Sequence, residues 1–396
     1  MHRDSNAKLT RREWLSASAL ASGALLFGLD KLELPQAAAS IQDDPFRGGR
    51  QLGVVPFIGE GRGEMETLLG EGLDGRLYTE LSALAPENPV VPAEKFYVRT
   101  RASKLLDDTK PWTIRVGGLV KQPVVLSLSD LRKSAKPAGL HLLECSGNAR
   151  LGHFGLLSAA DWAGAPLTEI LDQVKLDSRA ARILISGFDR YPVPSATSIP
   201  GASWIFTLDE IKSAKAFLAT EMNGKPLSRD HGAPVRYFMP GWYGCTCIKW
   251  VDEISFVAED IPATSQMREF AFRTHQQGVP QLAKDYRPAF IEQAAMPIRV
   301  EKWLVDGKIR YRVVGILWGG SRLINALEIR FNPDEDYVAV DHFQQSANDP
   351  WSFWWHAWTP KNPGAYLIRL RVKDPPVAAR RLDSGYYVRS LEITEV

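Results

Sequence analysis

Residues 140–148, LHLLECSGN, join a mostly apolar run to a tight turn, and the elements predicted around them indicate the fold class. The apolar run predicts a strand over residues 140–144, and Ser-Gly-Asn predicts a turn at residues 145–148. Around this point, predicted helices and strands mix without the βαβ order of a doubly wound sheet, so we predict an α+β domain. Its further elements are strands at 96–99, 112–116, 124–126, 182–187, 234–238 and 250–257 and helices at 128–132 and 166–174.

Beyond residue 298 the chain changes to short strands separated by turn residues. The dipeptide Asp306-Gly307 lies between two alternating runs, which predicts a β-hairpin. About seven short strands in roughly 100 residues are typical of an immunoglobulin-like sandwich, so we predict an all-β sandwich over residues 298–396. The segment Trp351–Trp358 reads WSFWWHAW, with large aromatic side chains on both faces. This pattern predicts a strand buried on both sides, with carbohydrate stacking as the alternative.

Two further segments complete the organisation of the chain. Residues 40–90 are rich in Gly, Pro and short polar runs, which predicts an irregular N-terminal wrap. Residues 261–297 are polar and rich in Gln and Pro, and we interpret them as a linker. The α+β domain then covers residues 91–260.

The composition excludes several classes of protein. Of the 396 residues, 45% are hydrophobic and 24% are charged, which is typical of a folded globular chain and excludes a disordered one. Lys and Arg total 48 against 46 Asp and Glu, a net charge of +2, so the basic excess of a nucleic-acid-binding protein is missing. Three Cys are too few for a disulfide scaffold or a Cys-ligated iron–sulfur cluster, and the sequence has no CxxCH haem-attachment motif.

The first 39 residues have the features of a bacterial export signal. A basic start with Arg11-Arg12 precedes a weakly apolar run at residues 17–29 and a small-residue stretch that ends near Ala39. The paired arginines resemble a twin-arginine signal, and an ordinary signal is the alternative. The apolar run is shorter than the roughly 20 residues that span a membrane. We therefore predict export to the periplasm and no membrane span after removal of the signal.

Cys145 is the first candidate for chemistry, because it lies in the turn directly after the predicted strand. A thiol at the end of a strand can face a cleft, and a nearby cation favours the thiolate, which acts as a nucleophile or metal ligand. Arg150 follows in the same segment, and Arg99 ends another predicted strand. The residues alone leave open the alternative that Cys145 is a small buried side chain.

A second candidate site lies at residues 229–250, where cations alternate with glycines. The side chains of His231, Arg236 and Lys249, together with backbone N–H groups, could bind a phosphate and a polar heterocycle. A solvated loop with one hydrogen-bonded histidine is the alternative.

Cys245 and Cys247 in the same segment could bind a metal or form a disulfide. Residues two apart on a strand lie at the upper limit of the distance that a disulfide bridges. A zinc site would need two more ligands, and no His or Cys has suitable spacing. We therefore predict two packed thiols.

Taken in chain order, these segments resemble the sulfite oxidase family of molybdopterin enzymes. The resemblance covers about residues 90–396 and is carried by several motifs. Residues 96–99 are similar to the family's strand with an active-site arginine, and residues 144–148 to its C-x-G-N turn. The other similar segments are residues 160–167, near R-W-x-G-x-x-L, residues 221–250, near the pterin-binding stretch, and residues 315–320 and 351–358, near the C-terminal immunoglobulin-like domain.

The resemblance implies a molybdenum held by a molybdopterin and by the thiolate of Cys145, since thiolate is a soft ligand. Arg99, Cys145 and Arg150 would be the catalytic residues, with both guanidinium groups beside the metal, where they can bind a small oxyanion such as sulfite. The implied activity is oxygen-atom transfer that oxidises sulfite to sulfate. The residues implied to bind the cofactor are Cys145, Asn148, His231, Arg236, Gly244 and Lys249.

The resemblance also implies partners. The family's haem domain has no counterpart in this sequence, so electrons would pass to an external acceptor such as a c-type cytochrome. Members of the family usually dimerise through the C-terminal domain, so a homodimer is expected through residues 298–396. A twin-arginine signal agrees with this cofactor, which is inserted before export.

Several positions depart from the family pattern. Ala149 replaces the first arginine of the usual C-x-G-N-R-R turn, and Arg101 replaces the histidine of R-x-H. Phe270 or Phe272 stands where sulfite-oxidising members place a tyrosine. Candidate replacements are Tyr286 for the tyrosine, and Arg380 or Arg381 as a further cation at the cleft. The alternative functions are a molybdenum reductase of sulfoxides or of another oxyanion, and a non-enzymatic exported binding module.

Overall fold

The computed structural model describes residues 44–60, 75–100, 106–107, 109–188, 202–320, 326–344, 350–373 and 378–396. The predicted export signal, residues 1–39, lies outside them. The described residues form four five-stranded sheets, and the α-helices between them are five to seven residues long. The fold is therefore richer in strands than the predicted α+β class indicates. No described helix has the length and apolar character needed to cross a bilayer.

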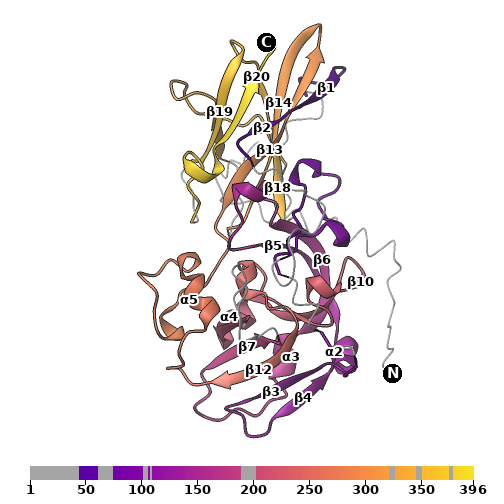
Figure 1. Ribbon diagram of the computed structural model, residues 1–396, viewed down its shortest axis with the longest axis vertical. Helices are drawn as coiled ribbons and strands as arrows, with labels where there is room; N and C mark the ends of the chain where they lie inside the picture. Colours follow the sequence, from indigo (N-terminus) through magenta and orange to yellow (C-terminus); the bar gives the residue numbers. More distant parts are fainter. Residues whose placement is uncertain are drawn as a thin grey trace, which may run out of the picture. The chain divides into compact units, whose positions relative to one another are not determined.

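The sheet that leads to Cys145 has the order β10-β9-β6-β5, and β11 also pairs with β9. Figure 1 labels strands β5, β6 and β10 of this sheet. Neighbouring strands are antiparallel, and the last residue of β5, Glu144, lies opposite the first residue of β6, Leu157. The predicted strand at 140–144 is thus confirmed as the end of a longer one. The strands are β5 Lys136–Glu144, β6 Leu157–Pro166, β9 Phe217–Met222, β10 Lys225–Pro226 and β11 Arg236–Phe238.

A second sheet has the order β4-β3-β12-β7-β8. Strand β12 runs parallel to β3, and the other neighbours are antiparallel. The strands predicted at 112–116, 124–126, 182–187 and 250–257 are confirmed with small changes at their ends. The strands are β3 Thr113–Gly118, β4 Val124–Ser127, β7 Arg182–Gly187, β8 Ser203–Thr207 and β12 Val251–Val257.

Short helices connect these strands. Helices α2 Leu128–Lys133 and α4 Leu208–Ala214 each begin at a capping box, in which the Ser127 or Thr207 hydroxyl accepts an N–H three residues later. Helix α3 Leu167–Leu171 is shorter than the helix predicted over 166–174, because residues 173 and 174 continue as i→i+3 turns. Helix α5 Ser265–Glu269 lies within the predicted linker.

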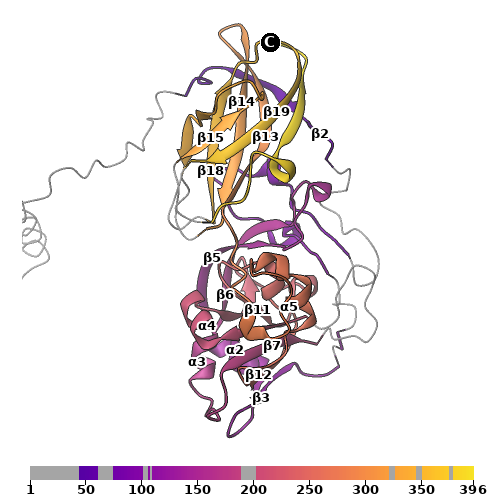
Figure 2. The same ribbon diagram turned by 90° about the vertical axis from the view of Figure 1, so that its left-hand side faces the viewer.

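The C-terminal residues form two sheets, which Figure 2 shows from the side. Their orders are β1-β13-β14-β18-β17 and β16-β15-β19-β20-β2, so one strand of the N-terminal segment joins each sheet. The predicted hairpin is confirmed, with φ of 50° at Asp306 and 74° at Gly307 between β13 and β14. The strands are β1 Arg50–Val55, β2 Phe57–Ile58, β13 Ala294–Val305, β14 Lys308–Trp318, β15 Leu327–Arg330, β16 Val338–Ala339, β17 His342–Gln344, β18 Trp351–Trp358, β19 Gly364–Val372 and β20 Arg389–Ile393.

Strand β18 confirms the predicted aromatic strand, and its first four residues are buried on both faces. Trp351 and Trp354 are each 1% exposed, which favours packing over carbohydrate stacking. An immunoglobulin-like arrangement of these two sheets, and dimerisation through them, stay predictions.

Residues 96–99 do not form the predicted strand. A 3₁₀ turn, Ala93–Lys95, precedes them, and only an isolated antiparallel bridge joins Val98 to Leu77. Backbone groups that would form hydrogen bonds to a neighbouring strand form them to side chains instead. The Tyr97 N–H donates to Ser158 Oγ at 3.1 Å, and the Phe96 carbonyl accepts from His231 Nε2 at 2.9 Å. The predicted strand at 234–238 is likewise shortened to β11.

Candidate active site

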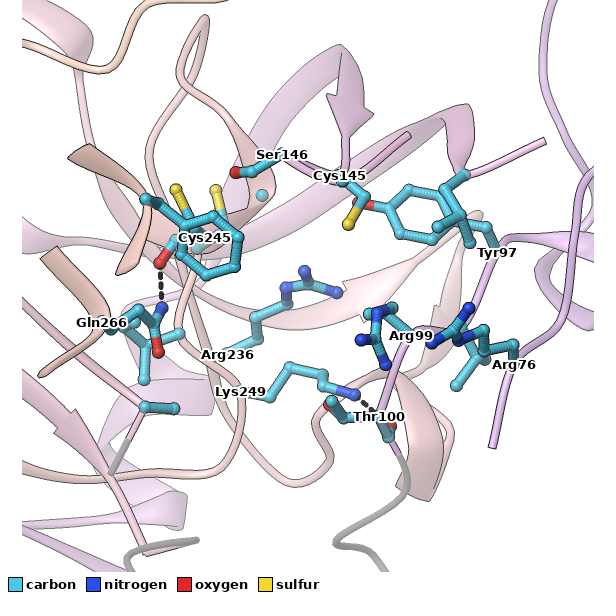
Figure 3. A pocket seen from close by; sticks show the side chains of 18 of the residues that line it. Arg76, Tyr97, Arg99, Thr100, Cys145, Ser146, Arg236, Cys245, Lys249 and Gln266 are labelled. Carbon is cyan, nitrogen blue, oxygen red and sulfur yellow. Dashed lines mark hydrogen bonds between the residues drawn. The ribbon is translucent and has the colours of Figure 1, made fainter. Parts of the chain in front are cut away.

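A cavity of about 400 Å³ opens beside the turn that follows β5 (Figure 3). Most of its lining comes from four parts of the sequence, namely residues 76–100, the Cys145 turn, residues 230–249 and residues 266–272, and Leu156 and Ala202 complete it. Segments that are distant in the chain thus meet around the Cys145 turn. Six of the eight site residues predicted from the sequence line this cavity, namely Arg99, Cys145, His231, Arg236, Gly244 and Lys249.

Backbone hydrogen bonds shape the turn that carries Cys145. The Cys145 N–H donates to the Leu156 carbonyl at 2.9 Å, and the Asn148 N–H donates to the Cys145 carbonyl at 3.0 Å. The Asn148 side chain accepts the Leu156 N–H at 3.1 Å. The backbone and the side chain of Asn148 therefore both make hydrogen bonds that close the turn. Asn148 is not among the residues that line the cavity, whereas the resemblance implied a contact with the cofactor.

Neighbouring groups both raise and lower the pKa of the Cys145 thiol. Burial raises the pKa of Cys145, while a hydrogen bond from the Gly147 N–H and the charge of Arg99 lower it. The charge of Glu144 raises this pKa, and that of Arg273 lowers it. The side chain is partly exposed and lines the cavity. A cationic group placed in the cavity would favour the thiolate further.

His231 is neutral at pH 7 and is held by both ring nitrogens. Burial lowers its pKa to about 4, with smaller contributions from Lys249 and Arg236. Nε2 donates to the Phe96 carbonyl at 2.9 Å, so Nδ1 accepts from the Ser228 hydroxyl at 2.7 Å. The ring is thus fixed in one tautomer at the wall of the cavity.

Lys249 and Arg236 reach the cavity from opposite ends of one loop. Lys249 Nζ donates to the carbonyls of Thr100 at 2.6 Å and Asp230 at 2.9 Å (Figure 3). Arg236 is 6% exposed, and its Nη1 donates to the His231 carbonyl at 3.3 Å. Burial lowers the pKa of Arg236. These contacts hold two buried or half-buried cations against the cavity.

Two glycines permit this close packing. Gly232 has φ of 108°, and a Cβ there would lie 3.1 Å from Lys249 Cβ and 3.2 Å from Arg236 Cβ. A Cβ at Gly244 would lie 2.9 Å from the hydroxyl of Tyr97 and 3.1 Å from the Glu144 carbonyl. Side chains at these two positions would push groups that line the cavity.

Arg150 lies away from the cavity, contrary to its predicted place beside the metal. Its Nη2 donates to the backbone carbonyls of Gly385 at 2.8 Å and Val388 at 2.9 Å. The 3₁₀ turn Arg150–Gly152 directs the side chain toward residues 385–388 because two carbonyl oxygens there accept its guanidinium. The motif spacing alone could not show this direction.

A buried polar cluster that the sequence did not predict lies directly behind Cys145. Arg380 forms two hydrogen bonds with the Glu144 carboxylate, at 2.6 and 2.8 Å, and Trp318 Nε1 donates to the same carboxylate at 2.8 Å. Glu144 is 1% exposed. Burial would raise its pKa, but the charge of Arg380 outweighs this and the pKa is lowered. We call Glu144, Arg380, Trp318, Tyr243 and Tyr387 the Glu144 cluster; the hydroxyls of both tyrosines accept from Arg380.

The turn is also held from its other side. Arg273 donates to the Ser146 carbonyl through Nη2 at 2.6 Å and Nε at 2.9 Å. Of the two C-terminal candidates, Arg380 belongs to the Glu144 cluster, and Arg381 pairs with Asp383 at the surface. Neither is among the residues that line the cavity.

The remaining candidates divide in the same way. Phe270 and Phe272 line the cavity, while the Tyr286 hydroxyl donates to the Pro280 carbonyl and is not part of the lining. Arg101 lies outside the described residues. Cys245 and Cys247 are buried thiols without a disulfide, as predicted, but both also line the cavity.

Two charged residues of the lining escaped the sequence analysis. Arg76 comes from the segment interpreted as an irregular wrap, and Glu269 ends helix α5. Burial raises the pKa of Glu269 and the charge of Arg99 lowers it. Tyr97 was placed only as part of a strand, yet its hydroxyl faces the cavity, and burial together with Cys145 holds its pKa well above 10. No local pattern marks these positions, because only tertiary contacts bring them to the cavity.

The cavity fits a large anionic group that carries a soft metal. Arg236 Nε is buried and has no hydrogen-bond partner among the described residues, so it can donate to a ligand. The lining also holds the partly exposed thiol of Cys145 and four Lys or Arg side chains, Arg76, Arg99, Arg236 and Lys249. A thiolate suits molybdenum, and guanidinium forks suit phosphate.

Comparison with known proteins agrees with this chemistry. The family profile for an oxidoreductase molybdopterin-binding domain matches residues 102–265. Human mitochondrial sulfite oxidase is 27% identical over 330 residues, which cover 77% of this chain and 58% of the relative. Sulfite oxidase of Arabidopsis thaliana is 23% identical over 296 residues, which cover 67% of this chain and 75% of the relative.

A solved structure shares the fold. The sulfane dehydrogenase SoxCD from Paracoccus pantotrophus superposes with a TM-score of 0.61 over 94% of this chain and 97% of that chain, at 16% identity. The chain spans a little over half the length of the human relative, 58%.

Proposed function

Because the chain belongs to the sulfite oxidase family of molybdopterin-dependent oxidoreductases, we propose that it transfers an oxygen atom to a small oxyanion, oxidising sulfite to sulfate. The overall reaction adds the oxygen of one water to sulfite and releases two protons and two electrons. The observation that carries this proposal is the Cys145 thiol in a cavity lined by guanidinium and ammonium groups. The family profile covers the cysteine turn and the cationic loop together.

When bound, molybdopterin supplies the redox chemistry of oxygen-atom transfer. The residues of this chain hold it in place. The Cys145 thiolate would bind the metal, and the Gly147 N–H and the Arg99 charge stabilise the deprotonated sulfur. Arg236 Nε and Lys249 Nζ would donate to the pterin and its phosphate. Gly232 and Gly244 leave room for this group beside the backbone.

Binding of the substrate anion falls to the remaining cations of the lining. Arg99 and Cys145 line the same cavity, so the Arg99 guanidinium could orient an oxyanion beside the metal that Cys145 would hold. Neutral His231 keeps its ring fixed and adds no charge at pH 7. Phe270 and Phe272 form an apolar part of the wall.

The organisation of the whole protein is part of the same proposal. Residues 1–39 would act as a twin-arginine export signal, which places the enzyme in the periplasm. Residues 91–260 would form the catalytic domain, followed by the linker at 261–297 and an immunoglobulin-like domain at 298–396 through which two chains dimerise. Electrons would pass to an external c-type cytochrome.

The first experiment measures the metal and the reaction together. Protein exported by a host that makes the cofactor is analysed for molybdenum and assayed with sulfite plus cytochrome c, and separately with methionine sulfoxide plus a reduced dye. We expect about one molybdenum per chain and sulfite oxidation. Activity only with the sulfoxide would instead support a reductase, and metal-free protein without activity would support a binding module.

Cys145→Ser tests direct ligation of the metal. The variant should lose at least about 100-fold in activity, because removal of a ligand exceeds the 10–100-fold effect of outer-shell changes. Cys247→Ser is the matched control, since a hydroxyl can replace the hydrogen bonds of Cys247 with the Met239 backbone. The control should retain molybdenum. Full activity in Cys145→Ser would refute the proposed ligand.

A further inference from the structure

Three arginine side chains gather on one face of the C-terminal sheet β16-β15-β19-β20-β2, outside the cavity. Arg330 of β15 lies directly opposite Arg369 of β19. Two positions away on the same two strands, Glu328 lies opposite Arg371. Side chains two positions apart in a strand point to the same face, so these four share a face, and Ile329, which points to the other face, is buried. The arginines therefore lie on the outer face of the sheet, whose strands β15 and β19 are labelled in Figure 2.

Positive charge exceeds negative charge on this face. The Glu328 carboxylate forms an ion pair with Arg371. Arg330 Nη1 donates to the Pro333 carbonyl at 3.2 Å, and within the part of the chain that the structure describes no carboxylate pairs with Arg330 or Arg369. Like charges in directly opposite positions destabilise a pair of strands. An anion between these two guanidinium groups would offset that cost.

Three polar atoms of this face are buried and lack a hydrogen-bond partner among the described residues, namely Arg330 Nε, Arg369 Nη1 and the Tyr337 hydroxyl. Tyr337 directly precedes β16 and so lies beside Arg330; its ring packs against the guanidinium groups of Arg330 at 4.5 Å and Arg371 at 4.2 Å. A buried donor without an acceptor costs free energy, and such groups in a native protein indicate a site for a water or an ion. This observation is independent of the charge excess and points to the same place.

We propose that Arg330, Arg369 and Tyr337 form a binding site for a tetrahedral oxyanion, sulfate or phosphate. The two guanidinium groups come from neighbouring strands, which lie about 5 Å apart, so one such anion can contact both. Guanidinium forks bind oxyanions through parallel hydrogen bonds, and the Tyr337 hydroxyl adds a neutral donor. Arg371 is left out of the site because Glu328 binds it.

The proposed oxyanion site is separate from the cavity beside Cys145. The lining of that cavity comes from residues 76–272, and the oxyanion site comes from residues 330–369 of the C-terminal sheet. The proposal therefore goes beyond the proposed function and does not depend on it. Sulfate is the product of the proposed reaction and phosphate is not, so both ions are tested.

Equilibrium dialysis with radiolabelled sulfate, and separately with phosphate, counts the ions bound per chain at constant ionic strength. Because the cationic cavity is expected to bind such ions as well, the proposed site is the part of the binding that Arg369→Gln removes. The variant should bind about one ion per chain fewer, with affinity at that site lowered about 10- to 100-fold. Arg369→Lys should recover part of the affinity, since it keeps the charge but not the fork.

The matched control is Arg381→Gln, which changes an exposed arginine of the same C-terminal part that pairs with Asp383 at 3.3 Å. This control should bind as many ions as the parent protein. The ion that Arg369→Gln loses with the larger change in affinity is the ligand of the site. Equal binding of both ions by the parent protein and by Arg369→Gln would overturn the proposal.

Thermal unfolding gives a second readout, which a purely structural role of Arg369 would not produce. In chloride, Arg369→Gln should unfold at the same temperature as the parent protein or higher, because the substitution removes one of two opposed like charges. In sulfate or phosphate at equal ionic strength, the parent protein should gain more than the variant, because an ion bound to the folded state stabilises it. A lower midpoint for the variant in chloride, or an equal gain for both proteins in both ions, would overturn the proposal. Neither measurement requires turnover, so failure of the proposed sulfite oxidation would leave the result unaffected.

Discussion

Charged groups lie on two sides of the Cys145 turn, and they are organised differently. Behind the turn, the Glu144 carboxylate is matched by the Arg380 guanidinium through two hydrogen bonds, and Trp318 adds a third. In the cavity in front of it, four cations face two carboxylates. In the first arrangement both carboxylate oxygens of Glu144 accept hydrogen bonds from the protein, whereas in the second the lining holds more cations than carboxylates. A buried arginine therefore has no single meaning: its neighbours decide whether it holds the fold or binds an anion.

Removing the Glu144 carboxylate from the Glu144 cluster should give the largest effect on the free energy of unfolding. Glu144→Ala removes both short hydrogen bonds between Arg380 and a carboxylate and leaves the longer pair with Glu292 at 3.9 Å. We expect a loss of about 3–5 kcal/mol in the free energy of unfolding by urea. Glu169→Ala removes a surface pair with Lys136, whose side chains are 47% and 59% exposed, and should cost at most about 1 kcal/mol. A similar small loss for both variants would mean that the Glu144 cluster does not hold the turn.

Protonation of His231, which lines the cavity, should lower the free energy of unfolding of the protein at acidic pH. Its folded-state pKa of about 4 lies below the value of 6.5 in the unfolded chain, so the unfolded state binds the proton first. Stability is present above pH 6.5 and falls as the pH drops from 6.5 toward 4. Between pH 7 and pH 5 the loss due to this group should be about 2 kcal/mol.

The measurement is urea unfolding of the parent protein and of His231→Gln at both pH values. The fall in stability should be about 2 kcal/mol smaller in the variant. Burial also lowers the pKa of His141, which remains in both proteins, so only the difference reports on His231. Equal pH dependence in the two proteins would contradict the buried neutral state.

A finer comparison separates backbone strain from crowding at the cavity. Gly232→Ala and Gly278→Ala both place Cβ at positive φ, 108° and 69°, which costs about 1–2 kcal/mol. At Gly278 a Cβ would meet nothing within 4 Å, whereas at Gly232 it would press on Lys249 and Arg236. We expect Gly232→Ala to cost about 1 kcal/mol more than Gly278→Ala and to bind less molybdenum. Equal stability and equal metal content in the two variants would show that Lys249 and Arg236 move aside at no cost.

Local patterns were sufficient for many elements. The turn formers after residue 144 and the Asp-Gly pair at Asp306 are local signals, and each marks the structural feature that was predicted. Residues 96–99 show the limit of such signals. Their composition suits a strand, but Ser158 and His231 take the backbone groups that a neighbouring strand would need.

The amino-acid sequence alone determined the cysteine turn, the cationic loop and their resemblance to the sulfite oxidase family, because these depend on residue types at short spacing. The tertiary structure decided which cations face the thiol. Arg150 is five positions from Cys145 and points away, whereas Arg76 reaches the cavity from a segment that no motif marks. Side-chain direction depends on hydrogen-bond acceptors brought near by folding, and their positions are set by contacts between residues far apart in the chain.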